Sequence, residues 1–253
     1  MKVSILQFDI AWGETGDNLS RLREAFGKCP GSDLYVLPEM FTTGFATQPG
    51  SKVDETPELT VAWMKEQARE GDCAIAGSIA VKDGDSYFNR FLFVTPDGNV
   101  TTYDKRHLFT YGGERTRFSP GSQRVVAEFR GMKFLLEVCY DLRFPVWSRN
   151  LGDYDAAIYV ANWPVVRQDA WDTLVKARAI ENQCFLLAAN RCGHDPVCDY
   201  LGGSAIINPY GQILQRAADY AEEWITAELD MGMLDSYRAK FPVLEDSDRF
   251  RLL

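Results

Sequence analysis

Short apolar runs of strand length recur along the whole chain of 253 residues, and their spacing restricts the fold more than any other feature of the sequence. Toward both ends these runs alternate with segments of helical periodicity, whereas hairpin signals such as Lys82-Asp83-Gly84-Asp85 join them in the middle. Helical connections favour parallel strands, and hairpins require antiparallel ones. The pattern therefore predicts an α/β (α+β) fold with one mixed sheet or two stacked mixed sheets, covered by helices.

The same patterns give approximate bounds for the elements. The predicted strands are Lys2–Phe8, Leu34–Leu37, Cys73–Val81, Tyr87–Val94, Val100–Tyr103, Arg124–Phe129, Met132–Cys139, Ala156–Ala161, Cys184–Asn190, Ser204–Ile207, Gln212–Gln215 and Trp224–Leu229. The predicted helices are Asp17–Cys29 with Asp17 as its N-cap, Thr60–Glu70, Ala170–Asn182 and a short one near Met231–Ala239. No repeat or linker divides the chain. We expect a single domain over residues 1–253, whose C-terminal tail, residues 231–253, packs on the domain or on a dimer partner.

Composition limits the classes of partner. The 36 acidic residues outnumber the 27 basic ones, which gives a net charge of −9. An acidic surface argues against nucleic-acid binding or anionic-membrane binding as the main task. The N-terminal stretch alternates like a strand rather than like a secretory signal, and no apolar run is long enough to cross a bilayer. We therefore expect a cytoplasmic protein that binds neither nucleic acid nor membrane.

The cysteines give no sign of a disulfide framework or a metal site. The six cysteines are scattered and form no Cys-x-x-Cys pair, as is typical of reduced thiols. Cys192, His194 and Cys198 are close together, but three ligands in one loop without a fourth make a weak zinc signal. We expect no metal site and no cofactor.

One thiol is distinguished by its position. Cys139 ends the apolar run Phe134–Val138, and an amphipathic segment, Val146–Leu151, follows, at which we expect a helix. At the end of a strand and before a helix, backbone N–H groups and the helix dipole stabilise a thiolate or an oxyanion. The alternative is that Cys139 is a small buried core residue, as most free cysteines are.

Glu39 and Lys105 share the context of Cys139, since each directly follows an apolar strand. Ligands in α/β folds bind outside the carboxyl ends of strands, so these three side chains could converge. A thiol needs a base to attack a carbonyl, and Glu39 is the natural base because no Cys–His–Asn arrangement is evident. Lys105 and the backbone N–H of Tyr140 could hold the oxyanion. Each of these residues could instead be structural: a solvated glutamate, a loop lysine and a core thiol.

Three motifs resemble the nitrilase superfamily of carbon–nitrogen hydrolases: Leu37-Pro38-Glu39-Met40-Phe41, Asp104-Lys105-Arg106-His107-Leu108-Phe109 and Glu137-Val138-Cys139-Tyr140-Asp141-Leu142-Arg143-Phe144-Pro145. They occur in the order that the family uses, and the similarity covers nearly the whole chain. The resemblance implies that Glu39 is the general base, Lys105 the oxyanion-stabilising cation and Cys139 the nucleophile. It also implies a four-layer α-β-β-α sandwich that usually forms a homodimer or a higher homo-oligomer.

The resemblance implies supporting residues as well. Glu114, after two glycines, would orient the lysine and the substrate amide, and Trp163 of Asn162-Trp163-Pro164 would form part of the pocket wall. Tyr111 is expected to contact the substrate. Our candidate for binding a distal carboxylate of the substrate is Arg143, whose guanidinium could clamp it unless a structural acid such as Asp141 occupies the arginine.

Within the superfamily, the motifs at Glu39 and Cys139 are most similar to those of the omega-amidases, which hydrolyse the terminal amide of α-keto acids such as 2-oxoglutaramate and 2-oxosuccinamate. True nitrilases usually carry Cys-Trp-Glu where this chain has Cys139-Tyr140-Asp141. The resemblance therefore implies an amidohydrolase that releases ammonia from a small-molecule amide. Three alternatives stay open: deaminated glutathione or another short amide or carbamoyl substrate, a catalytically silent binding protein, and a Cys–His enzyme that uses His107.

Overall fold

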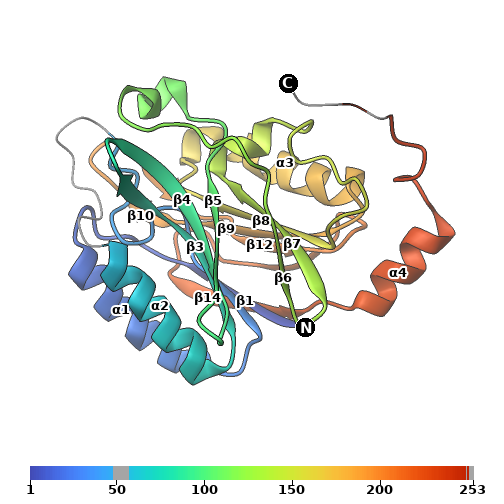
Figure 1. Ribbon diagram of the computed structural model, residues 1–253, viewed down its shortest axis with the longest axis horizontal. Coiled ribbons are helices and arrows are strands. Elements are labelled where there is room, and N and C mark those ends of the chain that lie inside the picture. The colour runs from blue at the N-terminus through green and yellow to red at the C-terminus, as the bar shows by residue number, and fades with distance from the viewer. Residues whose placement is uncertain (48–56, 249, 251–253) are drawn as a thin grey trace.

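The computed structural model describes residues 1–47, 57–248 and 250, which form two six-stranded sheets and the helices that cover them (Figure 1). The first sheet has the order β14-β1-β2-β3-β4-β5, with bounds Glu223–Glu228, Lys2–Gln7, Leu34–Val36, Ala74–Asp83, Ser86–Val94 and Val100–Asp104. The second has the order β13-β12-β9-β8-β7-β6, with bounds Ile213–Arg216, Ala205–Ile207, Phe185–Asn190, Ala156–Ala161, Met132–Val138 and Val126–Phe129. A separate hairpin joins β10 (Cys192–His194) to β11 (Asp199–Leu201).

Both sheets are mixed, as predicted. In the first sheet β1, β2 and β3 pair in parallel, and β3, β4 and β5 pair antiparallel. In the second sheet β7, β8 and β9 are parallel, while β6, β12 and β13 add antiparallel edges. It follows that β2 and β5 end at one edge of the first sheet, and that β7 and β8 end at one edge of the second.

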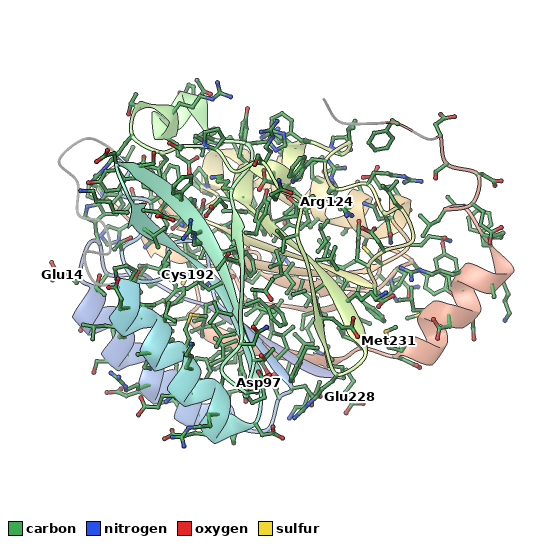
Figure 2. The ribbon with its side chains drawn as sticks, viewed as in Figure 1. Glu14, Asp97, Arg124, Cys192, Glu228 and Met231 are labelled. Atoms are coloured by element: carbon green, nitrogen blue, oxygen red, sulfur yellow. The ribbon has the colours of Figure 1, made fainter. Side chains whose placement is uncertain are left out.

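The main core lies between the two sheets, whose facing side chains fill the interior (Figure 2). Phe93 of β4 and Phe134 of β7 meet there with their ring centroids 5.6 Å apart. Burial of this apolar surface is the principal driving force for stacking the sheets.

Helices cover the two outer faces (Figure 1). Leu22 of α1 (Thr15–Lys28) and Trp63 of α2 (Pro57–Gly71) pack on the first sheet. Trp171 of α3 (Gln168–Glu181) packs on the second. The layer order is α-β-β-α, which confirms the predicted fold class.

The last helix, α4 (Met231–Lys240), is fastened to the second sheet and its helix layer. Leu234 is fully buried in the core. Arg238 donates hydrogen bonds to the carbonyl oxygens of Tyr154 at 2.8 Å and Gln183 at 3.0 Å, and to the carboxylate of Asp155 at 3.0 Å. Within the predicted tail, residues 249 and 251–253 lie outside the described part of the chain.

Some local predictions are wrong. Helix α1 begins at Thr15, so Asp17 lies inside its first turn and is not the N-cap. The segment Val146–Leu151 contains a turn and no helix. A short 3-10 helix, η3 (Cys139–Arg143), begins at the thiol instead. Trp147 fixes the turn, because its Nε1 donates to the Tyr103 hydroxyl at 3.2 Å, and this contact overrides the local amphipathic pattern.

Several short elements were not predicted. They are η1 (Thr110–Gly112), η2 (Glu114–Thr116), η4 (Val165–Arg167), β10 and β11. Each has three residues, which is too short to give a periodic signal. Among the described residues, no helix has the length and apolar character needed to cross a membrane.

Candidate active site

Glu39, Lys105 and Cys139 lie in one cluster between the carboxyl edges of the two sheets. All three side chains are buried. Lys105 directly follows β5, Cys139 directly follows β7, and Glu39 lies shortly after β2. Lys105 Nζ is 2.9 Å from Glu39 Oε1. The Cys139 thiol lies in the same buried cluster, where the charges of Glu39 and Lys105 shift its pKa in opposite directions. The fold thus brings the three predicted catalytic residues together.

A second buried carboxylate, Glu114 of η2, contacts the same lysine. Its Oε2 lies 3.0 Å from Lys105 Nζ and accepts the backbone N–H of Phe109 at 2.6 Å. Burial by itself would lower the pKa of Lys105, but the charges of Glu114 and Glu39 outweigh it and raise the pKa above its ordinary value. Burial raises the pKa of Glu114, against the opposing effect of Lys105. The lysine is therefore a fixed cation held between two carboxyl groups.

The thiol of Cys139 is neutral at rest. Burial, and then the charge of Glu39, raises the pKa of this thiol well above its ordinary value, and the charge of Lys105 offsets only part of the effect. A neutral thiol is a poor nucleophile, so its proton has to pass to a base during attack. Glu39, the carboxyl group whose charge most raises the pKa of this thiol, is the candidate base.

Two residues of the site have a strained backbone. Cys139 has a φ of 47°, and Met40, next to Glu39, has a φ of 46°. This left-handed conformation costs a non-glycine residue roughly 1–2 kcal/mol. Such strain persists only where the surrounding structure imposes it, and it concentrates at functional sites.

Two buried asparagines complete the hydrogen bonds of Glu39. Asn162, directly after β8, donates its backbone N–H to Glu39 Oε2 at 2.8 Å. Asn89 of β4 donates its side-chain amide to Glu39 Oε1 at 2.7 Å and to Glu114 Oε1 at 3.2 Å. Sequence reasoning missed Asn89, whose only signal was a polar residue inside an apolar strand. It treated Asn162 as part of the pocket wall and missed its contact with Glu39.

Asp141 holds η3 in place. Its carboxylate accepts the hydroxyl of Tyr103 at 2.8 Å and the backbone N–H groups of Val138 and His107 at 3.0 and 2.9 Å. It also lies 2.7 Å from His107 Nδ1. Among the described residues, Asp141 and Arg143 form no ion pair. The structural alternative for Arg143, a salt bridge with Asp141, is therefore not observed.

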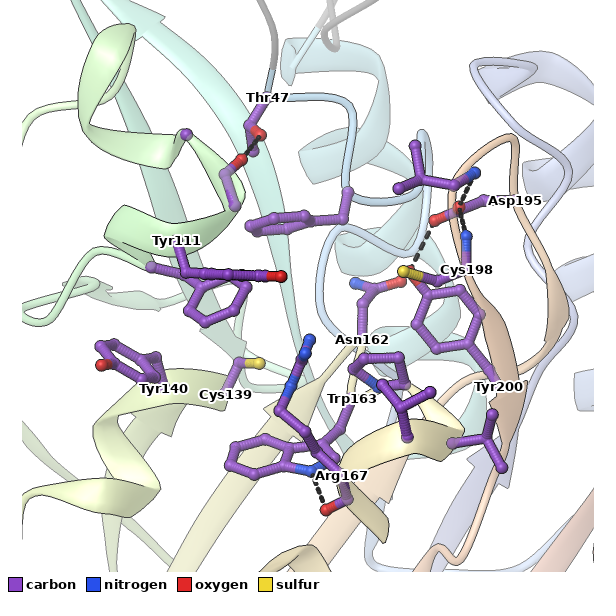
Figure 3. A pocket seen from close by; sticks show the side chains of 18 of the residues that line it. Thr47, Tyr111, Cys139, Tyr140, Asn162, Trp163, Arg167, Asp195, Cys198 and Tyr200 are labelled. Atoms are coloured by element: carbon purple, nitrogen blue, oxygen red, sulfur yellow. Dashed lines mark hydrogen bonds between the residues drawn. The ribbon is translucent and has the colours of Figure 1, made fainter.

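A cavity of about 670 Å³ opens at Cys139, and its lining includes all of the predicted substrate-binding residues, Tyr111, Tyr140, Arg143 and Trp163 (Figure 3). Tyr111 lies at the mouth with 89% of its surface exposed, whereas Trp163 is buried in the wall. Cys139 reaches the cavity, whereas Glu39 and Lys105 are buried behind it. The volume suits a small molecule.

Two further features bear on the chemistry of the site. Arg167 of η4 also lines the cavity and was not predicted. Within residues 1–47, 57–248 and 250, no three His, Cys, Asp or Glu side chains are placed to hold a metal ion. A polar cluster of thiol, carboxyl and ammonium groups beside a small cavity can support attack on a polarised carbonyl and proton transfer to the leaving group.

Comparison with known proteins places these features in a family context. Residues 2–239 match the family model described as carbon-nitrogen hydrolase. The chain is 45% identical over 253 residues to Omega-amidase YafV of Escherichia coli (strain K12), which covers 100% of this chain and 98% of the relative. It is 34% identical over 250 residues to the 2-oxoglutaramate amidase of Bacillus subtilis (strain 168), which covers 96% of each protein.

A solved structure agrees with the fold over its full length. The crystal structure of XC1258 from Xanthomonas campestris is described as a CN-hydrolase superfamily protein with an arsenic adduct in the active site. It superposes with a TM-score of 0.96 at 39% identity, and covers 100% of this chain and 98% of that one.

Proposed function

The chain belongs to the carbon–nitrogen hydrolase family, and we propose that it is an omega-amidase, which releases ammonia from the terminal amide of a small α-keto acid such as 2-oxoglutaramate or 2-oxosuccinamate. The observation that carries the proposal is the buried cluster of Glu39, Lys105 and Cys139, in which Lys105 Nζ lies 2.9 Å from Glu39 Oε1 and Cys139 lines the cavity. The names of the relatives from Escherichia coli and Bacillus subtilis support the same substrate class.

The first half of the reaction acylates the thiol. Glu39 takes the proton of Cys139 as sulfur attacks the amide carbon, because the raised pKa of the thiol leaves little free thiolate. Lys105 and the backbone N–H of Tyr140 stabilise the oxyanion, since η3 begins at Cys139 and its first N–H groups have no partner within the helix. Glu39 then passes the proton to the departing nitrogen, the C–N bond breaks, and ammonia leaves a thioester.

The second half hydrolyses the thioester. Glu39 takes a proton from water, the resulting hydroxide adds to the thioester carbon, and Lys105 again faces the oxyanion. The C–S bond breaks, the proton returns to sulfur, and a carboxylic acid is released. The hydrogen bonds from Asn162 and Asn89 keep the Glu39 carboxylate in one orientation through both halves.

An ammonia-release screen tests this proposal. The panel contains 2-oxoglutaramate, 2-oxosuccinamate, deaminated glutathione and a neutral amide, each with the wild type and with Cys139→Ala. We expect the highest kcat/KM on a keto-acid amide and no turnover by the variant. A clear preference for deaminated glutathione would move the assignment to that substrate, and absence of any turnover would favour a catalytically silent protein.

A further inference from the structure

Arg167 sends its side chain into the cavity that holds Cys139. Its backbone is fixed within η4, because the N–H donates to the Pro164 carbonyl at 3.0 Å and the carbonyl accepts Trp163 Nε1 at 2.8 Å. Figure 3 shows the side chain rising from this point, with its guanidinium end turned toward the side of Cys139. A substrate-binding side chain requires a rigid backbone and an orientation into the cavity, and Arg167 has both.

The guanidinium rests on aromatic rings and has no anionic partner. It lies 5.1 Å from the ring centroid of Phe109 and 5.9 Å from that of Tyr111. In the part of the chain that the structure describes, Arg167 takes part in no ion pair and its guanidinium in no hydrogen bond. Packing against aromatic rings orients the planar guanidinium and leaves its N–H donors available to a ligand.

The acidic residues of the cavity do not neutralise this charge. Asp195 is committed to its own loop, where it accepts the backbone N–H groups of Val197 and Cys198, each at 2.8 Å, and the hydroxyl of Tyr200. Asp199 is exposed at the rim. A half-buried cation without a counter-charge favours an anionic group brought by the ligand.

Arg143 shares the cavity but is placed differently. Its guanidinium lies 4.9 Å from the Trp163 ring, and the residue is exposed. It also lines a separate cavity of about 220 Å³ together with Arg106 and His107, and the lining of that cavity does not include Arg167. Of the two arginines, Arg167 is therefore the better placed to bind a ligand in the cavity that holds Cys139.

We propose that Arg167 is the principal binding residue for the distal carboxylate of the substrate, in the role that the sequence suggested for Arg143. This inference rests on the proposed function, because it concerns an amide whose far end is an acid. The guanidinium lies over the ring of Phe109. The backbone N–H of Phe109 donates a hydrogen bond to Glu114, and Glu114 also contacts Lys105. The carboxylate site and the reacting centre are thus adjacent through one loop.

The test compares kcat/KM for 2-oxoglutaramate with kcat/KM for pentanamide, a neutral amide of the same length. We expect Arg167→Gln to lose roughly ten- to a hundredfold on 2-oxoglutaramate, the range for a lost hydrogen bond to a charged group. The loss on pentanamide should be about twofold or less. Arg167→Lys should recover only part, because an ammonium lacks the bidentate fork. Arg115→Gln, an exposed change on η2, should match the wild type.

Three results would overturn the inference: an unchanged kcat/KM of Arg167→Gln on 2-oxoglutaramate, an equal loss on both amides, or a larger loss for Arg143→Gln. A binding experiment separates this inference from the proposed function, since it needs no turnover. In the Cys139→Ala background, calorimetry should show that Arg167→Gln weakens the binding of 2-oxoglutarate by roughly tenfold or more. Unchanged affinity would reject the role of Arg167 even in an active omega-amidase.

Discussion

Asn162 binds Glu39 from the opposite sheet. It donates its backbone N–H to Glu39 Oε2 at 2.8 Å and its side-chain amide to the Glu39 carbonyl oxygen at 2.7 Å. Glu39 follows β2 of the first sheet, whereas Asn162 follows β8 of the second. The orientation of the proposed base therefore depends on how the two sheets are stacked.

Replacing Asn162 by Asp should impair the chemical step. The new carboxylate would face Glu39 Oε2 and the Glu39 carbonyl, where the native amide donates. We expect kcat to fall roughly ten- to a hundredfold, the range known for residues that hydrogen-bond to a reacting group and orient it. Steady-state kinetics on 2-oxoglutaramate measures the effect. Asn208→Asp, in a turn far along the chain, is the matched control, and wild-type kcat for Asn162→Asp would contradict the role.

Glu39→Gln should suppress turnover without suppressing alkylation of the thiol. Glutamine cannot accept the proton of Cys139 during attack, whereas loss of the Glu39 charge removes one of the causes that raise the pKa of the thiol. Turnover should fall by roughly a hundred- to ten-thousandfold, the usual contribution of a general base. Iodoacetamide labelling of Cys139, followed by peptide mass spectrometry, should be at least as fast as in the wild type, because the thiol pKa falls when the Glu39 charge is removed. Half-buried Cys198 is an internal control with an unchanged rate. Turnover at the wild-type rate by Glu39→Gln would rule out Glu39 as the base.

Cys139→Ala should abolish ammonia release and leave the fold intact. The change removes the proposed nucleophile and replaces it with a small apolar residue at a buried position. The strained φ of 47° stays with the backbone, so a modest shift in melting temperature is expected. Circular dichroism and thermal melting check the fold. Ammonia release at an undiminished rate would end the proposed mechanism.

Glu137→Gln should stabilise the protein more as the pH rises. Burial, and then the charge of Asp141, raises the pKa of Glu137 well above its ordinary value, with Arg124 and Arg178 opposing the shift. A raised folded-state pKa gives stability that is present below the unfolded pKa of about 4.3 and is lost as the pH rises toward the folded value. Glutamine does not titrate, so it avoids this loss.

Melting temperatures of Glu137→Gln and the wild type between about pH 4 and pH 8 check this linkage. The difference should be small at the acid end and should grow in favour of the variant toward the alkaline end. Glu128→Gln, on the exposed side of β6, is the control and should show no such trend. A difference that stays constant with pH would mean that Glu137 ionises normally.

His107→Gln should remain active. His107 Nδ1 lies 2.7 Å from Asp141, and its ring stacks on Phe144 at 3.8 Å, outside the lining of the large cavity. We expect kcat within roughly tenfold of the wild type, since only a positioning contact is lost. An inactive variant with an unchanged melting temperature would restore the Cys–His interpretation.

The sequence alone was sufficient for the layered fold and for the residue types of the site. Strand length, helical period and hairpin turns are local signals, so they predicted the strands and helices but left one mixed sheet or two stacked sheets open, and the family resemblance implied the four-layer sandwich. Glu39, Lys105 and Cys139 each mark the end of an apolar run, which is why they could be selected before any geometry was known. The local signals were wrong where a tertiary contact determined the conformation. At Val146–Leu151 the expected helix is a turn, in which Trp147 Nε1 donates a hydrogen bond to the Tyr103 hydroxyl.

Only the tertiary structure decided which side chains meet. Asn89 and Asn162 support Glu39 from two different sheets, and nothing in their neighbouring residues indicates that contact. The proposed preference for Arg167 over Arg143 likewise depends on tertiary structure, because both arginines line the large cavity but Arg143 also lines a second one. Periodicity reports which face of an element is buried, whereas the partner across a sheet interface depends on packing between segments remote in the chain.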